Sequence, residues 1–144
     1  MDATEGHNLP LRCNLLGRGC GSRVGSTPSG VERWAIRVVG TDGRFVGGVV
    51  LELTSQPSSK SCVGVPDMLV ARIVERHGFV HDYVRDEAAV YLTNGNLYAD
   101  VSVGTCDHTL TISGTVTGSR AAGEASRSTL VGPMKVGRFT AERL

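Results

Sequence analysis

The densest group of ionisable side chains lies in the middle of the chain. Its members are Glu75, His77, His81 and Asp82. Carboxylates and imidazoles are the groups that bind metal ions or act as general acids and bases. On a strand, His77 and His81 would lie about 13 Å apart, whereas on a helix Gly78 would end the helix between them. We therefore interpret the group as a solvated turn and predict neither a metal site nor catalysis there.

A thiol nucleophile and a base are neighbours in the segment Cys106-Asp107-His108. Adjacent residues of an extended chain point away from each other, so a cysteine–histidine pair would need partners from distant segments. The chain also lacks a Gly-x-Ser-x-Gly motif around any serine. The Gly-x-Gly-x-Gly run at residues 17–21 has no lysine and follows no predicted strand, unlike a phosphate-binding loop. The sequence therefore predicts a protein that is not an enzyme and has no cofactor.

Cys62 and Cys106 lie in predicted loops beside strands, and we expect a disulfide bond between them. Closing a loop of this length would stabilise the folded chain by roughly 4 kcal/mol. The alternative is two unrelated buried thiols. A bond would predict a periplasmic or secreted protein, although no secretory signal is visible in the first 30 residues. Without the bond we expect a cytoplasmic protein.

Residues 1–30 are rich in Gly, Ser, Arg and Pro, and this composition predicts a flexible leader before a single domain of residues 31–144. The alternative is a start codon assigned too far upstream. Cys13 and Cys20 lie in the leader with six residues between them, which is not a zinc-ligand spacing.

The charge balance excludes several classes of function. The chain has 15 basic and 14 acidic residues and a formal net charge of +1, so no global field attracts nucleic acid or anionic lipid. No apolar stretch reaches the 18 or so residues that span a bilayer. We therefore expect neither nucleic-acid binding nor a membrane span.

Short alternating runs begin at Val31 and indicate strands with one buried face. Asn94-Gly95 separates two such runs and predicts a hairpin with a type I′ turn, which needs positive φ at both positions. The 19 glycines of the chain suit tight turns and bulges. In the first two runs, the residues expected to face inward are Trp34, Ile36, Val38, Val49, Leu51 and Leu53.

Seven to eight strands at spacings of about 8 to 12 residues are typical of a β-barrel or a β-sandwich. Short links between neighbours favour an antiparallel meander that forms a small barrel, with the sandwich as the alternative. The residue pattern of 67–77 fits a short helix that begins at Asp67 and fits a strand equally well. The barrel would be either packed with aliphatic side chains or hollow enough for a ligand.

Trp34 stands in the first predicted strand, and the chain closes with the run Gly-Arg-Phe-Thr-Ala-Glu-Arg at residues 137–143. In this respect residues 31–144 resemble calycin-type β-barrels, the superfamily of lipocalins and avidins. The Gly-x-Trp motif of lipocalins is absent, since Glu32 stands where its glycine would be. The resemblance implies that Trp34 packs near a basic residue of the last strands, Arg138 or Arg143. The ending is also similar to small bacterial periplasmic proteins, some of them of the immunity type.

These observations predict a non-catalytic bacterial binding protein, most simply an inhibitor or immunity-type factor that binds another protein. The alternative is a carrier that holds a small apolar ligand inside a calycin-like barrel. A core role is the competing interpretation of the single tryptophan. The sequence predicts no oligomeric state. The candidate binding residues are Trp34, Tyr83, Tyr91, Tyr98 and Arg138.

Overall fold

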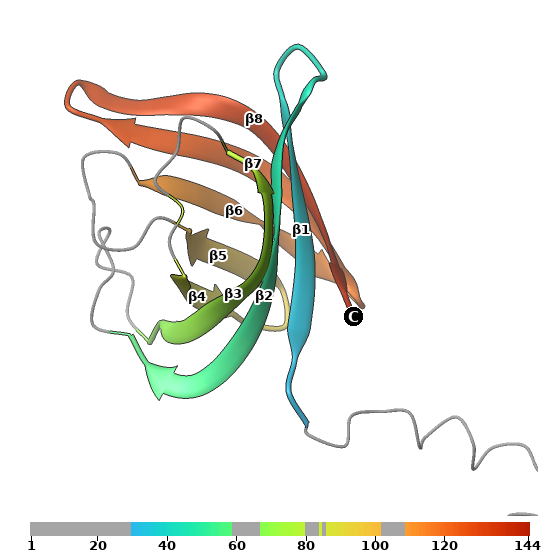
Figure 1. The fold of residues 1–144 in the computed structure, drawn as a ribbon. Coiled ribbons are helices and arrows are strands. Elements are labelled where there is room, and N and C mark those ends of the chain that lie inside the picture. The colour runs from blue at the N-terminus through green and yellow to red at the C-terminus, as the bar shows by residue number, and fades with distance from the viewer. Residues whose placement is uncertain (1–29, 59–66, 80–83, 85, 102–108) are drawn as a thin grey trace, which may run out of the picture. The chain divides into compact units, whose positions relative to one another are not determined.

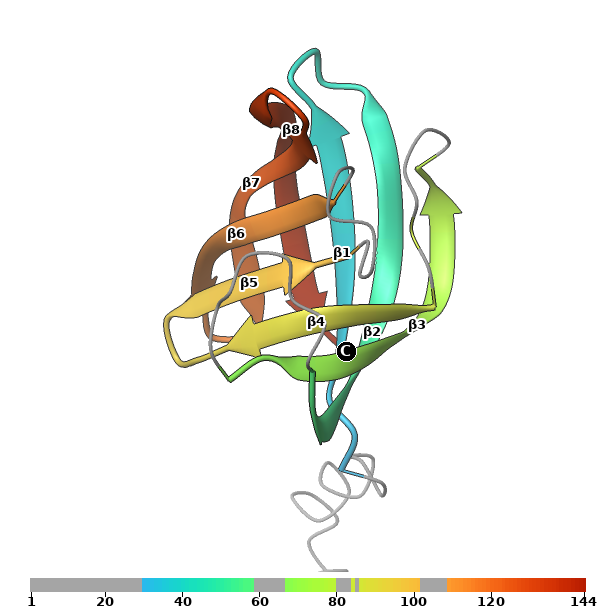
Figure 2. The same ribbon diagram turned by 90° about the vertical axis from the view of Figure 1, so that its left-hand side faces the viewer.

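The computed structural model describes residues 30–58, 67–79, 84, 86–101 and 109–144. These residues form an antiparallel meander whose sheet closes on itself as a barrel (Figures 1 and 2). The predicted barrel is therefore confirmed, and the β-sandwich alternative is wrong. The strands are β1 (Arg33–Gly40), β2 (Phe45–Pro57), β3 (Leu69–Gly78), β4 (Glu87–Leu92), β5 (Asn96–Asp100), β6 (Leu110–Thr117), β7 (Arg120–Thr129) and β8 (Gly132–Arg143).

Pairing between the first and the last strand closes the barrel. β1 and β8 are antiparallel, from Trp34 opposite Arg143 to Gly40 opposite Gly137. The Leu144 amide adds a hydrogen bond of 2.9 Å to the Arg33 carbonyl. Each strand therefore has a hydrogen-bonded neighbour on both sides, which satisfies backbone groups that an open sheet would expose at its edges.

The interior of the barrel is packed with apolar side chains. All the inward positions predicted for β1 and β2 are confirmed: five are at most 3 % exposed, and Leu53 is partly buried against them. Each fully buried aliphatic side chain stabilises the fold by about 1.5–3 kcal/mol. The core also includes Ala71, Phe79, Val84, Ala88, Val90, Leu97, Ala99, Val101, Leu110, Ile112, Ala121, Ala125, Phe139 and Ala141.

Glycines let β6 and β7 approach closely where the barrel wall bends. Gly114 and Gly123 lie opposite each other, and the buried Phe139 of β8 lies opposite Gly123 on the other side. A Cβ atom on Gly123 would be 2.1 Å from the Ser113 carbonyl oxygen and 2.5 Å from the Gly114 Cα. The backbone of β6 therefore occupies the space that a side chain on Gly123 would need.

The helix alternative for residues 67–77 is wrong, because Leu69–Gly78 is strand β3. Asp67 has a φ of 60°, which is left-handed and not the conformation of a helix N-cap. β3 pairs with β2 over much of its length and with β4 from Leu69 to Arg72. A helix here would leave the facing backbone groups of β2 and β4 without partners, so tertiary pairing outweighs the local helical period.

The hairpin predicted at Asn94-Gly95 is confirmed, since β4 and β5 pair with Leu92 opposite Leu97. The predicted type I′ geometry is wrong, because neither Asn94 nor Gly95 is among the described residues with positive φ. Thr93 holds the turn instead. Its amide donates to the Asn96 carbonyl at 2.9 Å, and its hydroxyl accepts from the amides of Gly95 and Asn96 at 3.4 and 3.1 Å.

The barrel belongs to a compact unit of residues Glu32–Leu144. Within the described ranges, no helix has the length and apolar character needed to cross a bilayer. Several predictions fall outside those ranges. They concern the leader apart from Gly30, the Cys62–Cys106 disulfide bond, and the side chains of Cys13, Cys20, His81, Asp82, Tyr83, Asp107 and His108.

Gly123→Ala tests the close approach of β6 and β7. The added methyl group overlaps the β6 backbone, so we expect the free energy of unfolding to fall by about 1–3 kcal/mol. Gly95→Ala is the matched control, because a Cβ atom there meets nothing within 4 Å, and we expect a change within about 0.5 kcal/mol. Urea denaturation followed by circular dichroism measures both, and equal midpoints for the two variants would contradict this account.

Candidate functional site

The structure does not gather the candidate binding residues into one site. Trp34 is 1 % exposed and lies inside the barrel. Tyr91 and Tyr98 are partly buried on the outer wall, directly opposite each other on β4 and β5. Arg138 is exposed on β8, five positions away from the residue that faces Trp34. Tyr83 lies outside the described residues.

Trp34 takes part in a contact between the two ends of the barrel sequence. Its indole Nε1 donates a hydrogen bond to Glu32 Oε1 at 2.7 Å, and Arg143 Nε donates to the same oxygen at 3.1 Å. The guanidinium carbon of Arg143 lies 5.1 Å from the centre of the indole ring, within cation–π range. Arg143, rather than Arg138, is therefore the basic residue that packs on Trp34.

Tyr91 and Tyr98 belong to a second apolar cluster, with Met68 and Ala89, which are 2 % and 0 % exposed. The Tyr98 hydroxyl donates to Oδ1 of the fully buried Asp100 at 3.3 Å. Burial and then the negative charge of Asp100 raise the pKa of the Tyr98 phenol. The phenol thus stays a hydrogen-bond donor at neutral pH, and the burial of its neighbours favours a structural role.

A row of three charged side chains crosses β1, β2 and β3 on the outer wall. Arg33 Nη2 contacts Glu52 Oε2 at 2.7 Å, and Arg72 Nη2 contacts Glu52 Oε1 at 2.6 Å. The hydrogen bond from Arg33 and the positive charges of both arginines lower the pKa of the Glu52 carboxyl, against the effect of its burial. Each carboxylate oxygen of Glu52 contacts one arginine. This row therefore links three strands and leaves few groups that could bind a ligand.

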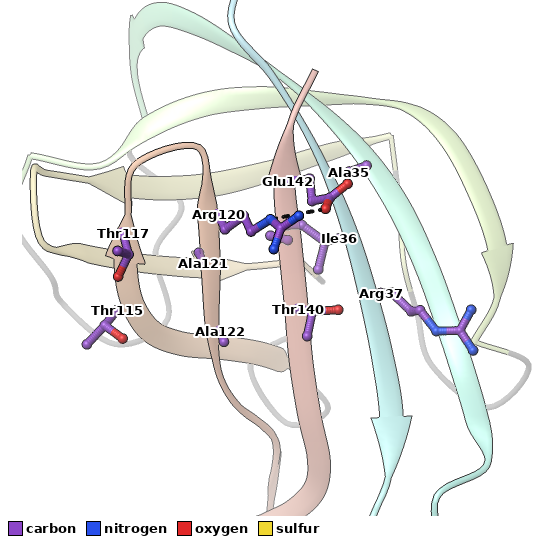
Figure 3. Close-up of a pocket in the computed structure, with 11 residues that line it drawn as sticks. Ala35, Ile36, Arg37, Thr115, Thr117, Arg120, Ala121, Ala122, Thr140 and Glu142 are labelled. Atoms are coloured by element: carbon purple, nitrogen blue, oxygen red, sulfur yellow. Dashed lines mark ion pairs between the residues drawn. The ribbon is translucent and has the colours of Figure 1, made fainter.

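A groove of about 570 Å³ lies on the outer wall over β6, β7, β8 and β1 (Figure 3). Strand register explains its composition, because two neighbouring rows of outward side chains cross these four strands. The backbone of Ile36, Ala121 and Ala141, whose side chains face the core, completes the lining. The first row is Arg37, Thr140, Ala122 and Thr115, and the second is Ala35, Glu142, Arg120 and Thr117.

The centre of the groove combines a small-residue floor with a charged edge. Thr140 and Ala122 lie opposite each other on β8 and β7. Their side chains are short, so the surface is hollow above them. Beside them, Arg120 Nε and Glu142 Oε1 form an exposed ion pair at 3.4 Å (Figure 3), worth at most about 1 kcal/mol. Such a partly exposed pair can exchange partners when a polar ligand approaches.

Arg37 marks the β1 edge of the groove. Its guanidinium carbon lies 4.8 Å from the ring centre of Phe45. The groove lining contains no cysteine, histidine or serine, the side chains that act as nucleophile and base in acyl transfer. The lining combines charged, hydroxylated and small apolar side chains.

The groove was not predicted from the sequence. Its visible signal was a series of small outward residues, such as Ala35, Ala122 and Thr140, at positions where a solvated wall usually carries long polar side chains. Only strand register shows that these residues are neighbours, because they lie on three strands from opposite ends of the barrel sequence.

Comparison with protein-family models, with curated proteins and with solved structures finds no match to this chain. Of the resemblance to calycins, the small antiparallel barrel is shown by the structure. In the part of the chain that the structure describes, no group of three or more His, Cys, Asp or Glu side chains could hold a metal ion.

Glu52→Gln tests the electrostatic role of the arginine–glutamate row. Folding lowers the pKa of Glu52. Between this lowered pKa of the folded chain and the ordinary pKa of the unfolded chain, the folded chain therefore binds fewer protons. Stability then falls as the pH drops through that window. The advantage of the wild type over the variant should be complete above the ordinary glutamate pKa of 4.5 and shrink below it.

Thermal unfolding at pH 7 and at steps down to pH 2 measures this difference. Glu124→Gln is the control, because the Glu124 side chain is 65 % exposed in its ion pair with Lys135, and its effect should stay small throughout. A wild-type advantage that is the same at every pH would refute the lowered pKa.

Proposed function

We propose that this protein is a non-catalytic binding protein that acts as an inhibitor or immunity-type factor, with its partner protein bound at the outer groove over β6, β7, β8 and β1. The observation that carries the proposal is the groove itself, an open hollow of about 570 Å³ in the barrel wall. Two other polar features of the described wall are paired within the fold. Glu52 is held by two arginines, and the Tyr98 hydroxyl is directed to a buried carboxylate.

The packed interior favours protein binding over transport of a small apolar ligand. A carrier needs an internal cavity of roughly 300 Å³ or more. Each of the eight strands contributes at least one buried apolar side chain, including Trp34, Phe139 and Leu51, each 1 % exposed. The described hollow lies on the outside of the wall, where a partner has direct access (Figure 3).

The chemistry of the groove suggests how a partner is held. A side chain or a short segment of the partner fills the floor over Thr140 and Ala122, where the small residues permit close approach. Arg120 and Glu142 then exchange their mutual ion pair for charged groups of the partner at the rim. Stable protein complexes bury about 1,200–2,000 Å² in total, so the interface extends onto the surrounding outer wall.

The compartment proposed for this activity depends on the cysteines. A Cys62–Cys106 bond would fit a periplasmic or secreted inhibitor, and reduced thiols would fit the cytoplasm. The calycin-like and immunity-type assignments belong to the same proposal. They are supported by the barrel topology and by the contact of Trp34 with a basic residue of the last strand.

Ala122→Trp tests the groove by filling its floor with an indole ring. The wild-type chain is used as bait in an extract of its source cell, the captured protein is identified and purified, and the dissociation constant is measured by calorimetry. We expect a one-to-one complex whose dissociation constant rises about tenfold or more in Ala122→Trp, because the indole occupies the volume that the partner needs.

Gln56→Trp is the matched control, since Gln56 is an exposed residue on β2 outside the groove lining. Its complex should bind as tightly as that of the wild type, and both variants should unfold at the wild-type temperature. The proposal fails if the source cell yields no stoichiometric partner, or if both tryptophan variants bind that partner with wild-type affinity.

A further inference from the structure

Two neighbouring aliphatic residues form the turn of the β7–β8 hairpin and are almost fully exposed. Leu130 is 86 % exposed and Val131 is 98 % exposed, the highest values among the large apolar side chains of the described residues. Met134 follows on β8 and is 50 % exposed. Exposure of this kind costs free energy of hydration and is typical of surfaces that bind apolar partners.

The turn has a defined structure that holds these side chains outward. The Thr129 hydroxyl donates to the Gly132 carbonyl at 2.7 Å, and the Val131 amide donates to that hydroxyl oxygen at 3.3 Å. Gly132 has a φ of 123°, a conformation that favours glycine. The hydrogen bonds of the turn therefore fix Leu130 and Val131 at the tip.

The β1–β2 hairpin carries a further exposed apolar residue. Gly40 of β1 is opposite Gly137 of β8, so the β1–β2 turn follows the end of β1 that pairs nearer to the β7–β8 turn. Both turns lie at the top of Figure 2, whereas in Figure 1 the β1–β2 turn points up and the β7–β8 turn points to the left. Phe45 begins β2 at this turn and is 48 % exposed. Arg37 covers one face of its ring.

Basic residues lie along the hairpin that carries the apolar tip. The hairpin carries Arg127, Lys135 and Arg138, and no acidic residue occurs between Ala125 and Ala141. Glu124 contacts Lys135 at 3.0 Å, so residues 124–141 carry three basic side chains and one carboxylate. On the β1–β2 turn, Asp42 contacts Arg44 at 3.7 Å. The chain as a whole has a net charge of only +1, so the positive field at this end is local.

We propose that this end of the barrel binds the surface of an anionic phospholipid bilayer. Leu130 and Val131 insert into the boundary between headgroups and acyl chains, and the cations of the hairpin contact lipid phosphates. An apolar tip on a basic hairpin matches such a surface, which accepts protruding side chains without needing a preformed pocket. Weak apolar insertion and weak electrostatic attraction reinforce each other, as peripheral membrane binding requires.

This surface is separate from the groove of the proposed function. The groove is lined by residues 120–122 and 140–142, at the other ends of β7 and β8 from the tip. Binding of a protein in the groove and of lipid at the tip can therefore occur together, and either can fail without the other.

The experiment is co-sedimentation of the full chain with vesicles of phosphatidylcholine alone and of phosphatidylcholine mixed with phosphatidylglycerol. We expect binding to the anionic vesicles that weakens as salt is added, because salt screens the cations. Replacing both tip residues, Leu130→Ser with Val131→Ser, should weaken this binding about tenfold or more. Arg127→Gln, three positions before Leu130, should weaken binding to anionic vesicles only.

Leu144→Ser is the matched control, since Leu144 is 70 % exposed at the other end of the barrel from the tip, and it should bind like the wild type. Far-UV spectra and unfolding temperatures establish that each variant folds, and the alanine pair Leu130→Ala with Val131→Ala replaces the serine pair if that variant unfolds. Absence of wild-type binding to anionic vesicles, or equal binding by the tip variants, would overturn the proposal. Ala122→Trp should bind vesicles normally, which separates this test from that of the groove.

Discussion

Hydrogen bonds between β1 and β8 join the two ends of the barrel sequence and turn a row of hairpins into a closed sheet. Closure gives the inward side chains neighbours on all sides. Trp34, Ile36 and Val38 are therefore at most 3 % exposed. The same pairing places Arg143 over Trp34 and aligns the rows that form the groove. Core packing, end closure and the candidate site therefore depend on one strand pairing.

The polar residues of the outer wall differ in how firmly they are paired within the fold. Glu52 lies between two arginines on neighbouring strands, and Asp100 is fully buried beside Tyr98. Over β6, β7, β8 and β1, by contrast, the outward side chains are short or weakly paired. This difference is the physical reason for proposing the groove as the binding surface, in place of the aromatic residues that the sequence first suggested.

The β7–β8 hairpin links the two proposed binding surfaces. Its open end, at residues 120–122 and 140–142, forms one side of the groove, and its turn carries the exposed pair Leu130 and Val131. The strands are held on both sides near the groove by β6 and β1, whereas the tip is supported by its own turn hydrogen bonds. A barrel built in this way can present a protein partner close to a lipid surface.

The sequence by itself determined the strands and their inward faces, because period-two alternation is a local property that each short run carries. It also indicated the Asn94-Gly95 hairpin, although Thr93 decided the turn geometry. Only the tertiary structure decided that residues 67–77 form a strand, since backbone partners on β2 and β4 outweigh their helical period. It also decided the groove, because the neighbours Ala122 and Thr140 are brought together by register, which no single run of sequence contains.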